Sequence, residues 1–282
     1  DLQICIKENT IKQELKGDLI LHRAVYNKVT SKFNDNEFEP LHITTYCDAP
    51  PGSGLGSSST IVVAMLKAYQ EYFNLPLGEY DIANLAFEIE RVDCNLSGGK
   101  QDQYCASFGG INFMEFHKND NVIVNPLRIK NSVLAELESS IILFFTGTSR
   151  DSASIINDQV NAISNEKKLN GLHKVKESAI AMKEFILKGD IENFFTLQKL
   201  AWEAKKATSQ LISNKNIEKI QEIVMGSNAI AIKISGAGGG GFMMIFCNPE
   251  NKINIINTLS NTKGSVYNFN FSKEGAESWK VV

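Results

Sequence analysis

The sequence predicts an α+β fold built from two domains, residues 1–150 and 151–282. Strand and helix patterns are mixed up to about residue 150, and long amphipathic helices with a small β-α-β ending follow. A length of 282 residues is enough for two hydrophobic cores. With 43% hydrophobic and 22% charged residues, the composition is that of a globular protein.

In the first part of the chain, alternating or short apolar runs predict strands, and apolar residues at helical spacing predict helices. The predicted strands are 2–7, 42–46, 111–116, 122–129 and 139–147. The predicted helices are 60–72 and 82–92, and the glycine-bounded segment 98–110 is expected to be loop with a short helix.

The second part of the chain has longer periodic segments. They predict helices over 152–163, 172–187, 190–212, 217–225 and 251–259. Apolar runs predict strands at 229–235, 242–248 and 265–271, with a glycine loop at 236–241.

Charge and cysteine usage exclude several classes of protein. Lys and Arg number 29 against 32 Asp and Glu, so a net charge of −3 favours neither nucleic acid nor a membrane surface as partner. No apolar run approaches the ~20 residues of a membrane span, and no signal peptide is visible. Five scattered cysteines and four histidines without ligand spacing argue against disulfides and zinc. We therefore expect a cytoplasmic protein, with a second copy of the chain, in a homodimer, as the candidate macromolecular partner.

The loop at residues 50–59, PPGSGLGSSS, leads directly into a predicted helix. Glycines let the backbone approach a ligand closely, and the N–H groups and positive dipole at a helix start favour an anion. The loop has no lysine before its serines, so it is not the common P-loop, and it is not GxGxxG. It predicts a phosphate site, and the alternative is a turn whose serines cap the helix.

A nucleotide bound at this loop would need a divalent cation, and Mg²⁺ takes oxygen ligands. Ser57 or Ser58 with one glutamate of the following helix would supply them. Helical geometry does not choose between Glu88 and Glu90, because both flank the apolar stripe. The alternative is that both are solvated partners of nearby cations.

Asp102 lies in the glycine-bounded segment beside Lys100. A carboxylate can accept or orient a hydroxyl proton, and we expect a nearby ammonium to keep it ionised. The alternative is an aspartate of a turn or cap. A second glycine loop, SGAGGGG at 235–241, lies between two predicted strands. Four consecutive glycines are more than a hairpin needs, so this loop predicts close approach of backbone or ligand.

These motifs together resemble the GHMP kinase superfamily. The segment 51–59, PGSGLGSSS, is similar to that family's nucleotide loop, with Ser59 where alanine is usual. The segment 233–241, KISGAGGGG, is similar to its third motif, in the expected order and distance. The resemblance covers nearly the whole chain. It implies an N-terminal domain like domain 2 of ribosomal protein S5 and a ferredoxin-like C-terminal domain.

The resemblance also implies roles for individual residues. ATP and Mg²⁺ are the implied cofactors, Ser58 and Glu90 the metal ligands, and Asp102 the catalytic carboxylate; Asp102-Gln103 also resembles the D-Q pair of galactokinases. The implied nucleotide-binding residues are Pro51, Gly52, Ser53, Gly54, Leu55, Gly56, Ser57 and Ser58. The implied substrate-binding residues are Lys100, Arg150, Gly236, Ala237, Gly238, Gly239 and Gly240.

Segments such as 98–116 and 144–153 are most similar to the branch that phosphorylates sugars at C1, and in particular to heptose 7-phosphate kinases. The implied substrate is a sugar phosphate, converted to the 1,7-bisphosphate on the route to GDP-heptose. Arg150, Lys100 and Arg23 are candidates for holding the second phosphate. A kinase of an unphosphorylated sugar such as fucose or galactose is the first alternative, and a ligand-binding regulator without catalysis is the second.

One motif of the family is missing. Its members open with a strand and a G-G-G-T-D type motif that contributes to the sugar pocket, whereas this sequence starts at DLQICIK. We therefore expect a fragment or a chain with omitted loops, so that part of the sugar pocket stays unassigned.

Overall fold

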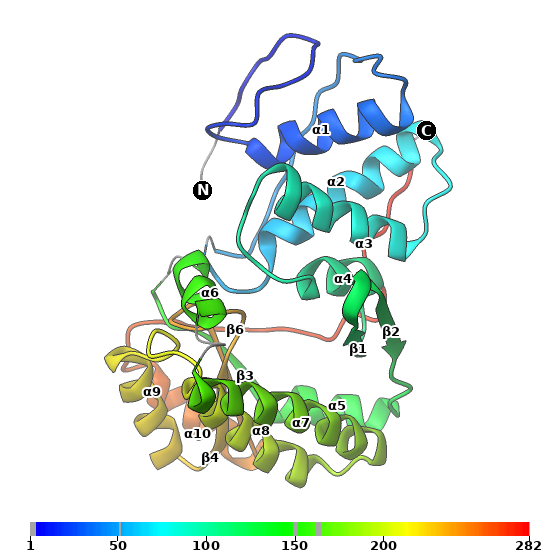
Figure 1. Ribbon diagram of the computed structural model, residues 1–282. Helices are drawn as coiled ribbons and strands as arrows, with labels where there is room; N and C mark the ends of the chain where they lie inside the picture. Colours follow the sequence, from blue (N-terminus) through cyan, green and yellow to red (C-terminus); the bar gives the residue numbers. More distant parts are fainter. Residues whose placement is uncertain (1–3, 51, 149–151, 162–164, 282) are drawn as a thin grey trace. The chain divides into compact units, whose positions relative to one another are not determined.

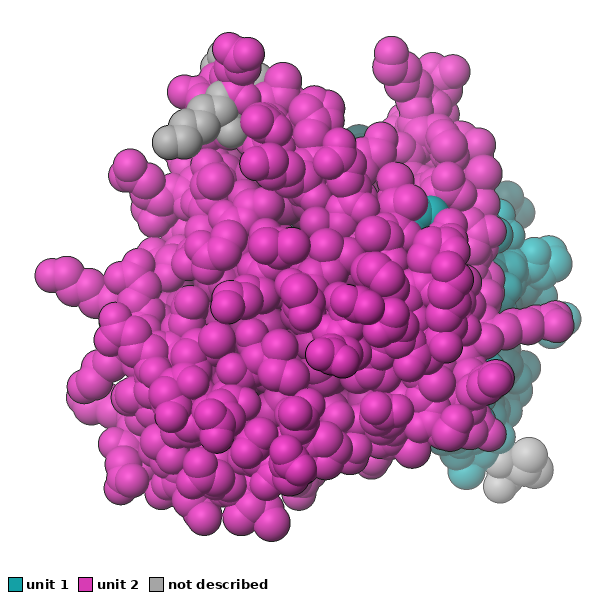
Figure 2. Space-filling view, turned by 90° about the horizontal axis from the view of Figure 1, so that it is seen from below, with its two compact units in different colours: residues 1–48, 56–114, 272–282 teal, residues 49–55, 115–271 magenta. Residues whose placement is uncertain are grey.

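The computed structural model describes residues 4–50, 52–148, 152–161 and 165–281, with its elements labelled in Figure 1. The chain forms two compact units, coloured separately in Figure 2: unit 1 takes in 1–48, 56–114 and 272–282, and unit 2 takes in 49–55 and 115–271. The chain passes from unit 2 to unit 1 between Leu55 and Gly56, inside the first glycine loop. The single boundary near residue 150 stays a prediction.

Unit 1 is helical. Its elements are α1 (Ile20–Phe33), α2 (Ser57–Phe73), α3 (Glu79–Phe87), the π-helical turn η1 (Glu88–Asp93) and α4 (Gln101–Phe108). Helices α1, α2 and α3 pack side by side (Figure 1). Their facing apolar residues, spaced three and four apart, form one buried core that includes Val25, Val62, Leu66, Ile82 and Ile89. This core fixes the start of α2, where the first glycine loop ends.

Unit 2 contains a four-stranded antiparallel sheet in the order β4-β5-β3-β6. Its strands are β3 (Ile141–Phe145), β4 (Ala229–Ile234), β5 (Phe242–Cys247) and β6 (Ser265–Tyr267). The helices are α5 (Asn131–Ser140), α6 (Ser152–Asn161), α7 (Glu166–Lys188), α8 (Ile191–Lys206), α9 (Lys215–Gly226) and α10 (Pro249–Leu259). A separate ladder joins β1 (Asn112–Phe116) to β2 (Val122–Pro126), with the short 3₁₀ turn η2 (Lys118–Asp120) between them.

Both faces of the four-stranded sheet are covered by helices, and α8 contributes to both through Trp202 and Phe195. Ile232 and Ile234 of β4 belong to a buried core that also contains residues of α9 and α10. On the opposite face, the ring of Phe246 packs against Phe195 of α8, with 5.2 Å between centroids. The second glycine loop connects β4 to β5 and is therefore held by two strands of this sheet. None of the described helices has the length and apolarity needed to cross a membrane.

The structure corrects several predicted elements. The predicted strands at 2–7 and 42–46 are wrong: residues 4–7 and 42–46 have no regular structure, and residues 2 and 3 lie outside the described part of the chain. A strand needs a hydrogen-bonded neighbour, and neither segment has one among the described residues. Helices α1 and α5 were not predicted, and neither N-cap side chain makes a capping hydrogen bond that would mark the start.

Candidate active site

The two glycine loops meet within unit 2. The backbone N–H of Phe242, which follows the second loop, donates to the carbonyl oxygen of Ser53 at 2.9 Å. Ser53 is fully buried. A Cβ atom built on Gly54 would lie 2.9 Å from the carbonyl oxygen of Ser235, so the two backbones are in contact there. Two motifs separated by about 180 residues of sequence thus form one structure, as a shared site requires.

The contact between the loops depends on glycine. Gly54 and Gly236 have φ of +74° and +63°, values that residues with a side chain rarely adopt. A Cβ atom on Gly236 would lie 2.8 Å from the carbonyl oxygen of Gly54, closer than real Cβ contacts. Gly236 is exposed, whereas Gly238 to Gly240 are buried and Ala237 packs against the core of the sheet. Of the loop residues predicted to bind substrate, Gly236 is the exposed one and is therefore accessible to a ligand.

Gly241→Ala is expected to destabilise the protein by about 2 kcal/mol or more, because the residue has φ of +81° and its Cβ would lie 2.2 Å from Ser53 O. Urea unfolding measures the change. Gly226→Ala is the matched control: it lies at the end of α9 with nothing within 4 Å of its Cβ position, so a change within about 1 kcal/mol is expected. Equal effects of the two variants would contradict the role of the loop contact.

The first loop ends at the start of α2, in unit 1. Gly56 precedes the helix with φ of +73°, and a Cβ atom there would lie 2.9 Å from Asp102 Cγ. Asp102 is in the first turn of α4. Glycine at position 56 therefore lets the catalytic candidate approach the helix start, where backbone N–H groups favour phosphate.

The hydroxyls at the start of α2 do not cap the helix. Ser58 Oγ donates to Glu90 Oε1 at 2.8 Å, and Ser59 Oγ donates to Glu90 Oε2 at 2.6 Å. The side-chain amide of Gln103 also donates to Oε2 of the same carboxylate. Glu90 is fully buried. A buried carboxylate needs such donors, so this cluster explains why serines rather than alanines follow the glycines.

The structure separates the two glutamates that helical geometry leaves equivalent. Glu88 accepts from Asn84 Nδ2 at 3.0 Å and pairs with Lys28 at 3.4 Å, away from the serines. The helix widens at residues 88–93 into a π-helical turn, which changes the angle between successive side chains. Glu90 therefore lies with Ser58, the partner that the family resemblance implies for it.

Asp102 lies in a different electrostatic environment from the one predicted. Burial raises the pKa of its carboxyl, nearby Glu90 raises it further, and Arg91 lowers it. The sequence predicts that Lys100 keeps Asp102 ionised, but the Lys100 ammonium lies over the Phe87 ring, 4.6 Å from its centroid. A cation that acts on Asp102 is Arg91, because the helix carrying Arg91 passes the loop before α4: Arg91 Nε donates to Gly99 O at 3.3 Å.

The remaining site candidates are placed as follows. Gly52 and Leu55 are exposed in the first loop, and Ser57 is the first residue of α2. Pro51 and Arg150 lie outside the described residues. Arg23 pairs with Glu8 at 2.6 Å and also donates to the Asp18 carbonyl oxygen, so its guanidinium ties the N-terminal segment to α1.

Sequence reasoning assigned no catalytic or metal-binding role to Gln103, Ser59 or Arg91. The D-Q pair pointed to Gln103 only as a mark of the family, and its amide proves to be a ligand of the Glu90 carboxylate. Ser59 stood out only because alanine is usual there. No signal in the sequence could reveal that Arg91 acts on Asp102.

The candidate residues are compatible with Mg²⁺. Ser58 Oγ and Glu90 Oε1 are 2.8 Å apart, so one cation could contact both oxygens. Among the described residues, no group of three or more His, Cys, Asp or Glu side chains could hold a metal ion. Mg²⁺ is typically coordinated by one or two protein oxygens together with phosphate and water oxygens, and the oxygens of Ser58 and Glu90 match that number.

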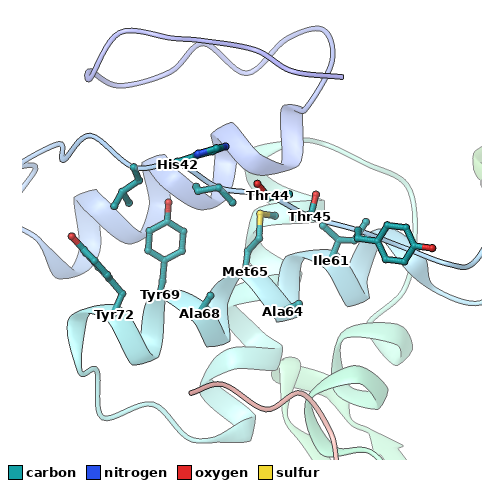
Figure 3. A pocket seen from close by; sticks show the side chains of 12 residues that line it. His42, Thr44, Thr45, Ile61, Ala64, Met65, Ala68, Tyr69 and Tyr72 are labelled. Carbon is teal, nitrogen blue, oxygen red and sulfur yellow. The ribbon is translucent and has the colours of Figure 1, made fainter. Parts of the chain in front are cut away.

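A cavity of about 420 Å³ lies elsewhere in unit 1, between residues 41–46 and α2. Figure 3 shows His42 and Thr44 on one side and Met65, Ala68 and Tyr69 on the other. Most of the lining is apolar, and the Tyr69 hydroxyl is buried without a hydrogen-bond partner among the described residues. Ser58, Glu90 and Asp102 do not line it. The candidate active site is therefore identified by its chemistry and does not coincide with this cavity.

Known proteins are similar to this chain over most of its length. Residues 19–110 match the GHMP kinases N terminal domain, and residues 182–265 match the GHMP kinases C terminal domain. The sequence is 44% identical over 265 residues to a D-glycero-alpha-D-manno-heptose 7-phosphate kinase of Campylobacter jejuni, covering 94% of this chain and 78% of the relative. It is 26% identical to an L-fucokinase/L-fucose-1-P guanylyltransferase of Bacteroides fragilis, over 78% of this chain and 24% of that protein.

A solved structure agrees with the sequence comparisons. The crystal structure of a D-glycero-D-manno-heptose 1-phosphate kinase from Bacteriodes thetaiotaomicron superimposes with a TM-score of 0.80 at 41% identity, covering 99% of this chain and 81% of that one. Its two-domain fold of helices and sheets is the α+β class predicted from the sequence. The chain therefore belongs to the GHMP kinase family, whose members transfer a phosphoryl group to an alcohol.

Proposed function

We propose that this protein uses ATP to phosphorylate the anomeric hydroxyl of D-glycero-D-manno-heptose 7-phosphate. The product would be the 1,7-bisphosphate, for GDP-heptose and surface polysaccharide synthesis in the cytoplasm. The observation that carries the proposal is Asp102 beside Gly56, in the same unit as Ser58 and the buried Glu90. The 44% identity to a heptose 7-phosphate kinase supports the choice of acceptor.

The nucleotide phosphates are assigned to the first glycine loop and the start of α2. Their charge is stabilised there by backbone N–H groups and the helix dipole. Ser58 and Glu90 would hold Mg²⁺, which, when bound, neutralises phosphate charge. Ser59 and Gln103 hold the Glu90 carboxylate in place, so the metal-binding oxygens are positioned before any ligand arrives.

Asp102 is assigned to the acceptor. Its carboxylate accepts the proton of the anomeric hydroxyl while that oxygen attacks the γ-phosphorus and the bond to ADP breaks. The raised pKa of Asp102 favours this role, because a carboxylate with a higher pKa is a stronger base and takes the proton more readily. The Glu90 charge contributes to that shift, so one carboxylate of the cluster serves the metal and also tunes the other.

The relatives' names leave two rival acceptors. One solved relative is named for heptose 1-phosphate, and a more distant relative acts on fucose by name. The first rival would place the new phosphate at a different carbon, and the second would need no phosphate on the acceptor. Both rivals use the same candidate active site, so only turnover distinguishes them.

The test is a turnover panel with ATP and Mg²⁺ over heptose 7-phosphate, free heptose, heptose 1-phosphate and fucose. We expect the highest kcat/KM with heptose 7-phosphate, exceeding free heptose by about tenfold to a hundredfold, the contribution of a charge-assisted phosphate contact. Phosphorus NMR of the product would show a phosphate at C1. Equal or higher kcat/KM with fucose or heptose 1-phosphate would overturn the proposed acceptor.

A further inference from the structure

Two lysines of unit 2 flank the second glycine loop without a carboxylate partner. Lys205 is in the last turn of α8, and Lys233 is in β4, two residues before the loop. Among the described residues neither forms an ion pair. The residues of the two glycine loops, 52–58 and 235–241, include no acidic side chain. Both ammonium groups therefore carry charge that the described chain does not neutralise.

The two lysines share one face of the sheet. Successive strand residues point to opposite faces, and Ile232 and Ile234 face the core formed with α9 and α10. Lys233 is therefore on the opposite face. The register pairs Ala231 of that face with Phe246, whose ring packs on α8. Helix α8 also carries Lys205, and it packs against β4, the strand that carries Lys233.

Lys205 contacts Gly236, the exposed glycine of the second glycine loop. Its Nζ donates to the carbonyl oxygen of Gly236 at 2.6 Å. Gly236 is the exposed glycine that lies against Gly54 of the first loop. An ammonium group has three donors, so two remain after this bond. They are available at the place where the two glycine loops meet.

The charges act on each other. Burial and, to a smaller extent, nearby Lys233 together lower the pKa of Lys205 to about 8; burial also lowers the pKa of Lys233. Half-buried like charges without a counter-charge are unfavourable in the free protein. A bound dianion would relieve both costs, because each ammonium would gain an opposite charge and a hydrogen-bond acceptor.

We propose that Lys205 and Lys233 form a phosphate-binding site beside Gly236, within unit 2. Its ligand is a phosphate group, either the terminal phosphate of the nucleotide or the phosphate already on the acceptor. The inference rests on the proposed function only for the identity of these two ligands. Lys205 and Lys233 would then contribute to phosphate recognition, for which the sequence suggested Arg150, Lys100 and Arg23.

The test measures binding by calorimetry to the full chain and to Lys205→Met and Lys233→Met. The probes are ADP, a non-hydrolysable ATP analogue, heptose 7-phosphate and free heptose. Each substitution is expected to weaken one phosphate-bearing probe by about tenfold or more. Weaker binding of the ATP analogue but not ADP assigns the nucleotide's terminal phosphate. Weaker binding of heptose 7-phosphate but not free heptose assigns the acceptor phosphate.

Lys206→Met is the matched control. It is the next residue on α8, but its ammonium pairs with Glu203 at 2.8 Å and lies over the Trp202 ring. Its removal should leave the dissociation constants of all four probes unchanged. Lys205→Met should melt at or above the temperature of the parent chain, because it removes an unneutralised charge. Weaker binding in a variant of undiminished stability cannot be ascribed to unfolding.

The inference would be overturned if no phosphate-bearing probe binds the parent chain, if both substitutions leave binding within about twofold, or if Lys206→Met weakens binding equally. Loss of free heptose or ADP binding to the same degree would also overturn it, since a purely structural lysine would have that effect. Lysine-dependent phosphate binding without turnover of any sugar would leave this inference standing and overturn the proposed function instead.

Discussion

Replacing Asp102 with Asn is expected to lower kcat about a thousandfold while the KM for ATP changes little. Asparagine keeps the shape of the side chain but cannot accept the proton of the attacking hydroxyl. Gly56, which would meet the Asp102 side chain if it carried a Cβ, needs no adjustment for this isosteric change. Release of ADP at saturating ATP and acceptor measures kcat, and binding of a non-hydrolysable ATP analogue reports the nucleotide site.

Asp93→Asn is the control for this variant. Asp93 is in the same unit, and its carboxylate pairs with Lys28 at 3.0 Å, away from the serine cluster. Its substitution should leave kcat within about twofold, because a partly exposed ion pair contributes at most about 1 kcal/mol to stability. A kcat of Asp102→Asn within tenfold of the parent value would remove Asp102 from the proposed reaction.

The stability of Asp102→Asn should distinguish lost chemistry from lost structure. Burial and Glu90 raise the pKa of Asp102, so the folded chain binds this proton more tightly than the unfolded chain. As the pH rises through the unfolded and then the folded pKa, the ionised carboxylate makes folding less favourable. At neutral pH the neutral Asn side chain should therefore not lower the melting temperature. An inactive variant that melts at or above the parent temperature would place the defect in the reaction.

The sequence predicted those parts of the site that depend on local backbone. Glycine runs such as those at 52–56 and 236–241 indicate positive φ wherever they occur, and these residues have it at most positions. The strands β4 and β5 were predicted because their apolar residues are continuous, as in buried strands. These features need no knowledge of distant residues.

Features set by tertiary contacts could not be predicted in the same way. The alternating segment 42–46 reads as a strand, but no neighbouring strand pairs with it among the described residues. The choice of Glu90 over Glu88 depends on a π-helical turn, which a regular helical period does not predict. Lys205 is one of several lysines on an amphipathic helix, and only the fold brings its ammonium to Gly236.

Glu90→Gln tests the other half of the candidate active site and is expected to lower kcat by about a hundredfold or more. Glutamine has a single acceptor oxygen, whereas the Glu90 carboxylate accepts from Ser58, Ser59 and Gln103. Its amide nitrogen would face a hydroxyl or amide donor in the buried cluster. A loss of about 1–3 kcal/mol in the free energy of unfolding should accompany the loss of activity.

Binding of nucleotide with and without Mg²⁺ separates metal binding from stability, because misfolding weakens both whereas a lost ligand removes only their difference. For the parent chain Mg²⁺ should tighten binding of the ATP analogue, and for Glu90→Gln this gain should be lost. Glu88→Gln is the control: it is two residues away, and its partners are Asn84 and Lys28. If Glu88→Gln abolished the tighter binding with Mg²⁺ and Glu90→Gln retained it, the metal ligand would be Glu88 and not Glu90. If instead Glu90→Gln abolished the tighter binding and Glu88→Gln retained it, Glu90 would be the metal ligand. A buried glutamate that accepts from two serines would then distinguish this nucleotide loop from the common P-loop, which uses a lysine.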